Sequence, residues 1–375
     1  LHYPLRRQRQ MCIRDSDYPV LFLLLFASNA LSGLLNCFVR GIDKVKEVAI
    51  SGVLSSAVMI ALNLLFLLPL HMGLLGFFLA TIIGSFSQSI YLFVAIKGWN
   101  YFQITSRDKQ LHRDMVNYSQ PLILNNISWW VNGVSNRYII TWFCGIAANG
   151  IYSVSYKIPS ILVMFQGIFS QAWTMSAVQG YDKDDKNGFF TRMYQSYNLC
   201  MVLVCSVLIM LSRVMAKFLY ANDFYNAWKY VPFLLIASVF GALSGYVGGI
   251  YAATKDTKIF AKTSIMGAVT NLLLTFVLVW KVGVMGAAIA SPVSYGLIWY
   301  LRIKGINKYM DMKINLFKDV LGYIILLIQT VLLFIFPDNI LFFILQLLAI
   351  VILLLLNKVL LSIVIIKITN KFIKR

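Results

Sequence analysis

Two basic residues are the strongest candidates for chemistry in this sequence, because each stands among apolar residues. Arg137 follows an apolar run that begins at Pro121, and Lys157 lies inside another, two residues before Pro159. A charged side chain is costly in such surroundings unless it meets water, a partner or a charged ligand. The 14 acids of the chain lie outside the apolar segments or at their ends, so none is placed to neutralise Lys157. Arg137 and Lys157 therefore indicate a binding site for an anion.

Polar and aromatic residues accompany Arg137 at helical spacing. Winding residues 116–137 at about 100° per residue produces two neighbouring lines. The first line contains Asn125, Trp129, Asn132 and Asn136, and the second contains Asn126, Trp130, Gly133 and Arg137. We expect this polar side to face a bundle interior or a hydrated cavity, since amides are costly in hydrocarbon. The alternatives are hydrogen bonds between helices for the asparagines and, for Arg137, snorkelling to the interface from the helix end.

The segment 147–171 continues this polar character. Ser160, Gly167 and Gln171 share the helical face of Lys157, and Gln166 offers a further amide. Pro159 predicts a kink beside Lys157, because proline cannot donate the backbone hydrogen bond of a helix interior.

Membrane-spanning helices must position these residues. The chain has 375 residues, 59% of them hydrophobic and 13% charged, with a mean hydropathy of +0.76. A spanning helix needs about 20 mostly apolar residues, and eleven segments meet this requirement. Their approximate limits are 18–39, 48–70, 74–96, 116–137, 147–171, 194–212, 231–252, 263–280, 284–301, 319–336 and 340–366. Several connections are very short, so neighbouring helices run antiparallel, and we predict an all-α, polytopic transmembrane bundle.

The basic residues indicate topology rather than nucleic-acid binding. The formal charge is +19, but the cations are spread between apolar segments and form no single patch. One set of alternate connections holds Arg137, Arg213, Lys217, Lys229 and Lys281. The opposite set, which includes the C-terminal tail, holds most of the others, among them Arg40 and Arg302. The positive-inside rule therefore places the C-terminus in the cytoplasm.

Motifs for other chemistry do not occur in the sequence. The five cysteines form no CxxC or Cys/His cluster, and there is no Walker A, HExxH or GxSxG motif. We therefore expect no metal site, no cofactor and no enzymatic activity. Cation-coupled drug export generally needs a carboxylate within the membrane, which these segments lack, although helices upstream could supply one.

Residues 1–17 do not fit the predicted topology. They contain four arginines and do not begin with Met, yet eleven helices and a cytoplasmic C-terminus would place them outside. We interpret them as a non-native or frayed end, with a targeting segment as the alternative. We expect further helices upstream in the natural protein, an odd number if its N-terminus is cytoplasmic.

An internal repeat indicates two homologous lobes. Residues 30–98 and 242–305 share ALSG, NLL, GLLG against GVMG, and IKG, in the same order and at nearly constant offset. Transporters are often built from such repeats, with the substrate path between the halves. The polar stretch 97–115 would then be the boundary.

Three stretches of the chain resemble a known family. They are "YSQPLILNNISWWVNGVSNRYIITWFCGIAANGIYSVSYKIPSIL" (118–162), "FYNAWKYVPFLLIASVFGALSGYVGGIY" (224–251) and "KVGVMGAAIASPVSYGLIWYLR" (281–302). They resemble the O-antigen- and capsule-type polysaccharide biosynthesis flippases of the multidrug/oligosaccharidyl-lipid/polysaccharide exporter superfamily. The pattern around Asn136 and Arg137 is the most specific part of the resemblance. A common family form has an acid where this chain has Asn136, and this departure leaves Arg137 without a local partner.

The resemblance implies a fourteen-helix protein of two six-helix lobes and two terminal helices, of which this chain has helices four to fourteen. Residues 18–96 then form the second half of the first lobe, and 97–115 form a cytoplasmic loop between the lobes. The second lobe is 116–301, a cytoplasmic loop is 302–318, and 319–375 are two further helices with a basic tail.

The implied function is transport of an undecaprenyl-diphosphate-linked oligosaccharide across the bacterial cytoplasmic (inner) membrane. The implied partners are this anionic lipid, membrane lipids and other polysaccharide-assembly membrane proteins. Arg137, Lys157 and, at the cytoplasmic mouth, Arg40 would stabilise the diphosphate. Donors to sugar hydroxyls would be Asn125, Asn126, Asn132, Asn136, Gln166 and Gln171, and the stacking rings would be Trp129 or Trp130. The alternatives are a cation-coupled exporter of small molecules from the same superfamily and a membrane glycosyltransferase or polymerase, which the short loops do not support.

Overall fold

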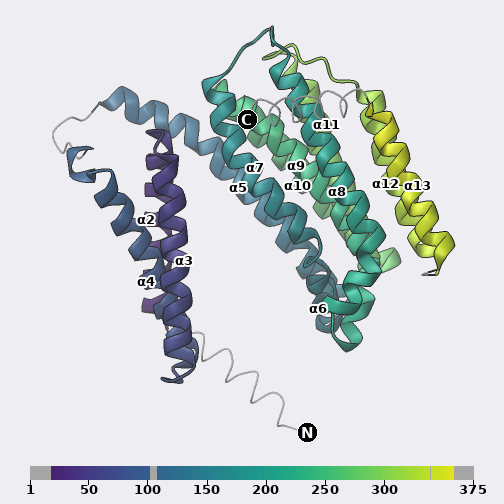
Figure 1. Ribbon diagram of the computed structural model, residues 1–375, viewed down its shortest axis with the longest axis horizontal. Coiled ribbons are helices and arrows are strands. Elements are labelled where there is room, and N and C mark those ends of the chain that lie inside the picture. Colours follow the sequence, from purple (N-terminus) through teal and green to yellow (C-terminus); the bar gives the residue numbers. More distant parts are fainter. Residues whose placement is uncertain (1–17, 102–107, 338, 359–375) are drawn as a thin grey trace, which may run out of the picture. The chain divides into compact units, whose positions relative to one another are not determined.

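The regular elements of the protein are helices throughout the part that the structure describes. The computed structural model describes residues 18–101, 108–337 and 339–358 (Figure 1). The chain divides into two compact units, Leu1–Asp108 and Lys109–Arg375. The expectations for residues 1–17 and for 359–375 fall outside the described residues.

The first unit contains three long helices and a short 3₁₀ turn. These elements are α2 (Pro19–Gly41), α3 (Val45–Leu67), α4 (Gly73–Ala95) and η2 (Gly98–Tyr101). Helix α4 packs against both α2 and α3. Gln88 joins all three helices, because it accepts a hydrogen bond from Ser32 at 2.6 Å and donates to Asn36 at 3.4 Å and to Ser51 at 3.3 Å. Amide side chains thus connect helices that are otherwise apolar.

The second unit is a larger bundle built around one buried helix. Its elements are α5 (Lys109–Cys144), α6 (Ile146–Ser155), α7 (Pro159–Gln179), α8 (Phe189–Leu219), η3 (Asn222–Lys229), α9 (Val231–Ala253), α10 (Thr257–Val282), α11 (Val284–Ile306), α12 (Leu316–Ile335) and α13 (Ile340–Leu356). Helix α9 packs against α7, α8 and α11, and most of its residues are buried. Its small residues allow close approach, as at Gly249, which lies against the Trp173 ring. The Trp173 indole stacks on Tyr246 with 4.1 Å between ring centroids and donates to the Tyr246 carbonyl oxygen at 2.8 Å.

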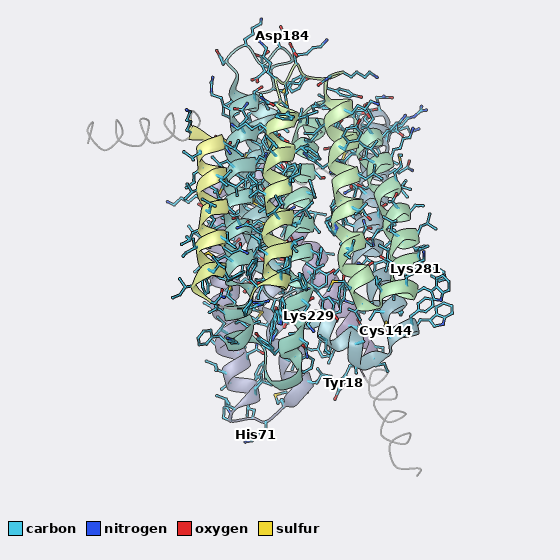
Figure 2. All side chains as sticks on the ribbon, turned by 90° about the vertical axis from the view of Figure 1, so that its right-hand side faces the viewer. Tyr18, His71, Cys144, Asp184, Lys229 and Lys281 are labelled. Carbon is cyan, nitrogen blue, oxygen red and sulfur yellow. The ribbon has the colours of Figure 1, made fainter. Side chains whose placement is uncertain are left out.

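The connections of the second unit gather at two opposite ends, as the antiparallel prediction requires. Figure 2 shows Asp184 at one end, and Cys144, Lys229 and Lys281 at the other. At the first end, the amide of Asp311 donates to the Lys183 carbonyl oxygen at 3.0 Å. At the second, Arg213 of α8 donates to the Phe336 carbonyl oxygen at 2.9 Å, where α12 ends.

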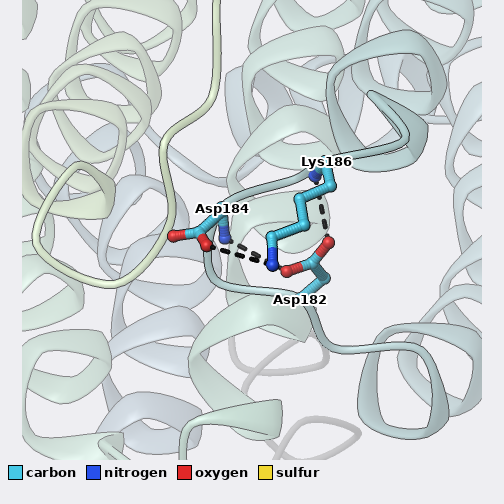
Figure 3. A network of polar contacts seen from close by, with 3 residues as sticks. All are labelled: Asp182, Asp184 and Lys186. Carbon is cyan, nitrogen blue, oxygen red and sulfur yellow. Dashed lines mark hydrogen bonds and ion pairs between the residues drawn. The ribbon is translucent and has the colours of Figure 1, made fainter.

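Polar contacts organise the loops at the Asp184 end. In the 180–188 connection, Asp182 accepts from the backbone amides of Asp184 at 3.2 Å and Lys186 at 3.0 Å (Figure 3). The Lys186–Asp184 ion pair, at 3.8 Å, is largely exposed and adds little stability. Nearby, Tyr309 donates to Asp256 at 2.5 Å, and this hydrogen bond raises the pKa of Tyr309 to about 12.

The predicted fold class is confirmed. Nine of the described helices are long and apolar enough to cross a membrane. Helix α5 is also long, but it carries the polar lines, and the described part of α13 is shorter.

The structure agrees with one predicted detail of the helices and contradicts two. The disruption predicted at Pro159 is present as a turn over residues 156–158, which divides the segment into α6 and α7. Helix α5 continues to Cys144, so Arg137 does not lie at a helix end. Arg302 does not lie in a connection, because α11 continues to Ile306 and buries it. The physical reason is the same for both arginines: a positive charge after an apolar run usually marks the end of a spanning helix, and here the helix continues beyond it.

Replacement of Gly286 by alanine should destabilise the second unit. A methyl group at Gly286 would lie 2.3 Å from the Leu278 carbonyl carbon of α10, so the α10–α11 hairpin would have to open. We expect Gly286→Ala to lower the free energy of unfolding by about 2 kcal/mol, measured as a lower thermal unfolding midpoint in detergent. Gly133→Ala is the control, because nothing lies within 4 Å of its added methyl. Equal midpoints for both variants would contradict this packing.

Candidate functional site

The two polar lines of α5 have different environments. The first line is turned into the bundle: Asn125, Asn132 and Asn136 are 6%, 2% and 1% exposed, and Trp129 is half-buried. The second line is turned out of it: Asn126, Trp130, Gly133 and Arg137 are all exposed. The exposed line is therefore open to lipid or to a ligand, whereas Asn125 and Asn136 of the buried line bind neighbouring helices.

Asn136 is the centre of the buried line. Its Nδ2 donates to the hydroxyls of Tyr152 at 3.2 Å and Ser291 at 3.1 Å. Its Oδ1 accepts from Asn271 and Thr275, both at 2.9 Å. The amide thus joins α5 to α6, α10 and α11, and all of its hydrogen-bonding capacity is used within the bundle.

The other two buried asparagines of α5 have unequal surroundings. Asn125 accepts from Ser264 of α10 at 2.5 Å and donates to the side chain of its exposed neighbour Asn126 at 3.4 Å. The side-chain amide of Asn132 is buried without a hydrogen-bond partner among the described residues, although its backbone carbonyl accepts from Asn271 at 3.4 Å. Neither residue faces the outside directly.

Lys157 stands in the break between α6 and α7. Pro159 is the first residue of α7, where its missing N–H costs nothing. The Lys157 amide donates to the Val154 carbonyl oxygen at 3.0 Å, and the Ser160 hydroxyl donates to the Lys157 carbonyl oxygen at 2.6 Å. The Lys157 side chain is exposed, as are Ser160, Gly167 and Gln171 along α7.

Tyr156 connects the helix break to Arg137. The Tyr156 hydroxyl lies 3.1 Å from that of Tyr152, and Arg137 is close enough to Tyr156 for an electrostatic interaction. Lys157 is the next residue along the chain, so the two cations found in the sequence belong to neighbouring parts of the second unit. The sequence reading did not include Tyr156.

Helix α9 lies beneath this region. Trp129 of α5 meets Tyr295 of α11 edge to face, with 4.9 Å between ring centroids. A methyl group at Gly241 of α9 would lie 3.6 Å from Tyr295 and 3.9 Å from Trp129. One turn further, a methyl group at Gly245 would lie 3.6 Å from the Gln166 amide of α7. Half-buried Trp129, Tyr295 and Gln166 thus converge on the small residues of α9.

Arg302 is a buried cation that the sequence reading placed in a loop. Its side chain is 0% exposed. Apolar residues at helical spacing on both sides, such as Ile298 and Ile306, were a signal that could have found it. Arg40, the third predicted cation, lies in the last turn of α2 in the first unit and is half-buried.

These features define a multi-pass helical protein with a polar, cationic face, as expected of a membrane transporter. Residues 14–178 match the family of polysaccharide biosynthesis proteins. The chain is 19% identical over 205 residues to the probable low-salt glycan biosynthesis flippase Agl15 of Haloferax volcanii, covering 54% of this chain and 43% of that protein. It is 23% identical over 262 residues to multidrug and toxin extrusion protein 1 of Rattus norvegicus, covering 63% of this chain and 44% of that protein. The chain therefore spans less than half the length of these two curated relatives.

Solved structures share the fold. The crystal structure of a MATE protein in the bent conformation matches with a TM-score of 0.65 and 14% identity, covering 78% of this chain and 68% of that one. The lipid II flippase MurJ, in an inward closed conformation, matches with a TM-score of 0.57 and 15% identity, covering 92% of this chain and 72% of that one. Together with the family match, these findings confirm the resemblance to polysaccharide flippases of the multidrug/oligosaccharidyl-lipid/polysaccharide exporter superfamily.

Truncation of the adjacent residues Asn136 and Arg137 should affect the stability of the protein to different extents. Asn136→Ala leaves Asn271, Thr275, Tyr152 and Ser291 without their shared partner, so we expect a loss of about 2 kcal/mol in the free energy of unfolding. Arg137→Ala removes an exposed side chain, and we expect a change within about 0.5 kcal/mol. Thermal unfolding in detergent and abundance in the membrane measure both. A stable Asn136→Ala protein would show that the buried amide is dispensable.

Proposed function

We propose that the protein is a flippase that moves an undecaprenyl-diphosphate-linked oligosaccharide across the bacterial cytoplasmic membrane. The observation that carries this proposal is the pair of exposed cations, Arg137 on α5 and Lys157 between α6 and α7, with Arg137 within electrostatic range of Tyr156, the neighbour of Lys157 in the chain. Transporters use discontinuous helices at their binding sites, because the break lets backbone and side-chain polar groups meet the cargo. The similarity to a family of polysaccharide biosynthesis proteins supports the choice of cargo.

The diphosphate is the part of the cargo that requires the cations. A phosphate group carries charge that hydrocarbon does not solvate, and a guanidinium binds it through paired hydrogen bonds. Arg137 and Lys157 supply this stabilisation in the second unit. Arg40 of the first unit has the same role at the cytoplasmic entrance.

The glycan and the prenyl tail are bound by different means. Gln166 and Gln171 donate to sugar hydroxyls, and the 66% exposed Trp130 ring offers a face for stacking, while half-buried Trp129 packs against Tyr295. Asn125 and Asn136 act from behind, by holding α5 in place through hydrogen bonds to neighbouring helices, and Asn132 is buried beside them. The prenyl tail stays in the bilayer, and no bond of the cargo is made or broken, so the protein is a transporter and not an enzyme.

The orientation follows from the basic residues. The end of the second unit that carries Asp184 (Figure 2) is the cytoplasmic end, and the positive-inside rule assigns the C-terminus to the cytoplasm as well. The partners are the anionic polyprenyl diphosphate, membrane lipids and other membrane proteins of polysaccharide assembly.

A cation-coupled exporter of small molecules is the second candidate. The match to multidrug and toxin extrusion protein 1 favours it. The candidate site does not, because Arg137 and Lys157 would repel an organic cation. Uptake of tetraethylammonium by proteoliposomes, driven by a proton or sodium gradient, would support this second function.

Removal of either exposed cation should impair transport of the lipid-linked oligosaccharide. We expect Arg137→Ala and Lys157→Ala each to lower the flipping rate by about tenfold or more, because each removes a charge-assisted contact to the diphosphate. The assay follows a fluorescent polyprenyl-diphosphate oligosaccharide in proteoliposomes, with restoration of surface polysaccharide in a flippase-null strain beside it. Lys281→Ala is the matched control, since Lys281 is exposed at the end of α10. Wild-type transport by both Arg137→Ala and Lys157→Ala would contradict the proposal.

A further inference from the structure

Arg302 carries a buried positive charge to which the proposed function assigns no role. Its guanidinium is fully buried, and burial of a charge without a compensating partner is strongly unfavourable. The acceptors that the described residues offer it are all neutral, and the Phe260 ring lies 4.0 Å from the guanidinium carbon. Its hydrogen bonds go to Thr263 Oγ1 at 3.1 Å, Ser244 O at 2.8 Å, Ser264 Oγ at 2.7 Å, Asn125 Oδ1 at 3.4 Å and Phe260 O at 3.4 Å. The positive charge is thus solvated by the bundle but not cancelled.

A short chain of hydrogen bonds leads from this charge to the outside. The Asn125 oxygen faces Arg302 and Ser264, so its amide nitrogen points the other way and donates to Asn126 Oδ1 at 3.4 Å. With its oxygen held in this way, Asn126 presents its NH₂ group on the exposed line of α5. Polarised hydrogen-bond chains in a low-dielectric interior strengthen one another. A donor backed by a buried cation is suited to an anion.

Asn126 and Arg137 mark two positions on one exposed line. They are eleven residues apart on α5, which corresponds to about 16 Å along the helix axis. Asn126 lies at the middle of α5, and Arg137 lies about two turns before its last residue, Cys144. A phosphate group could not contact both at once over this distance.

We propose that Arg302, acting through Asn125, prepares a second anion subsite at Asn126 on the path of the cargo headgroup. Arg302 is a positioning residue in this scheme, since it does not touch the ligand, and Asn126 makes the contact. The ligand class is a phosphate or diphosphate, free or attached to a lipid. The proposal rests on the proposed function for the identity of the cargo. It adds a second anion-binding position on α5, between the start of this helix and Arg137.

Binding of farnesyl diphosphate to the full-length protein in nanodiscs tests the subsite. Farnesol measures the contribution of the tail, and inorganic diphosphate distinguishes a free anion from a lipid-linked one. Asn126→Leu removes the exposed donor, and Arg302→Met removes the charge at similar volume. We expect each to weaken farnesyl diphosphate binding by about tenfold and to leave farnesol binding unchanged. Lys281→Met, which changes the net charge equally, should bind as the wild type does.

The conservative variant separates a charge effect from bracing. Arg302→Lys keeps the positive charge and loses the planar fork, so we expect it to retain affinity to within about threefold. If Arg302→Met fails to fold, the exposed Asn126→Leu still decides the question. Wild-type affinity in Asn126→Leu would overturn the proposal and leave Arg302 as a brace between helices. The proposal would also be overturned if Arg302→Lys lost as much affinity and as much stability as Arg302→Met.

The two proposals fail in distinguishable ways. If Arg137→Ala abolishes binding of farnesyl diphosphate while Asn126→Leu does not alter it, the flippase site stands and the second subsite is wrong. If the wild-type protein binds neither farnesyl diphosphate nor inorganic diphosphate, the proposed cargo is wrong and the subsite falls with it.

Discussion

Hydrocarbon offers no hydrogen bonds, so a polar group inside a spanning helix is costly unless it finds a partner within the protein or reaches water. In the second unit this constraint is met at Asn136, whose amide binds four side chains from α6, α10 and α11. Helix α5 is the most polar of the long helices that the structure describes, and this network is what allows it to pack against apolar neighbours. The position of every other group on α5 follows, because fixing one face of a helix fixes all of them.

The candidate site is a consequence of that fixed face. Once Asn125, Asn132 and Asn136 are turned inward, Asn126, Trp130, Gly133 and Arg137 are turned outward. The buried line therefore fixes the orientation of the exposed line without contacting a ligand itself. Variants of the buried asparagines would reduce transport through loss of structure, which explains why proximity to Arg137 in sequence is a poor guide to direct contact with cargo.

Much of this arrangement follows from the sequence, and the remainder depends on neighbours that a single chain does not reveal. Helical winding separated the two lines of α5, because it depends only on the angle per residue. Which line is buried depends on the partners Asn271, Thr275 and Ser291, which lie more than a hundred residues away. Pro159 correctly marked a disruption, but its separation into two helices depends on how residues 156–158 are packed. The prediction placed Arg302 in a connection because a positive charge after an apolar run is usually the end of a spanning helix. In the structure, five neutral acceptors form hydrogen bonds with its guanidinium inside the bundle.

The contrast between the interior and the break suggests how such a site can act during transport. The hydrogen bonds of Asn136 and Arg302 tie α5, α9, α10 and α11 together, so these helices should move as a body. The α6–α7 break is different, since Lys157 and Ser160 at this point are exposed and the helical backbone bonding is interrupted by Pro159. Reorientation of Lys157 therefore requires no repacking of the core, whereas displacement of Arg137 relative to Asn126 would require distortion of α5 itself. A headgroup that travels along this unit would meet fixed contacts on α5 and an adjustable one at Lys157.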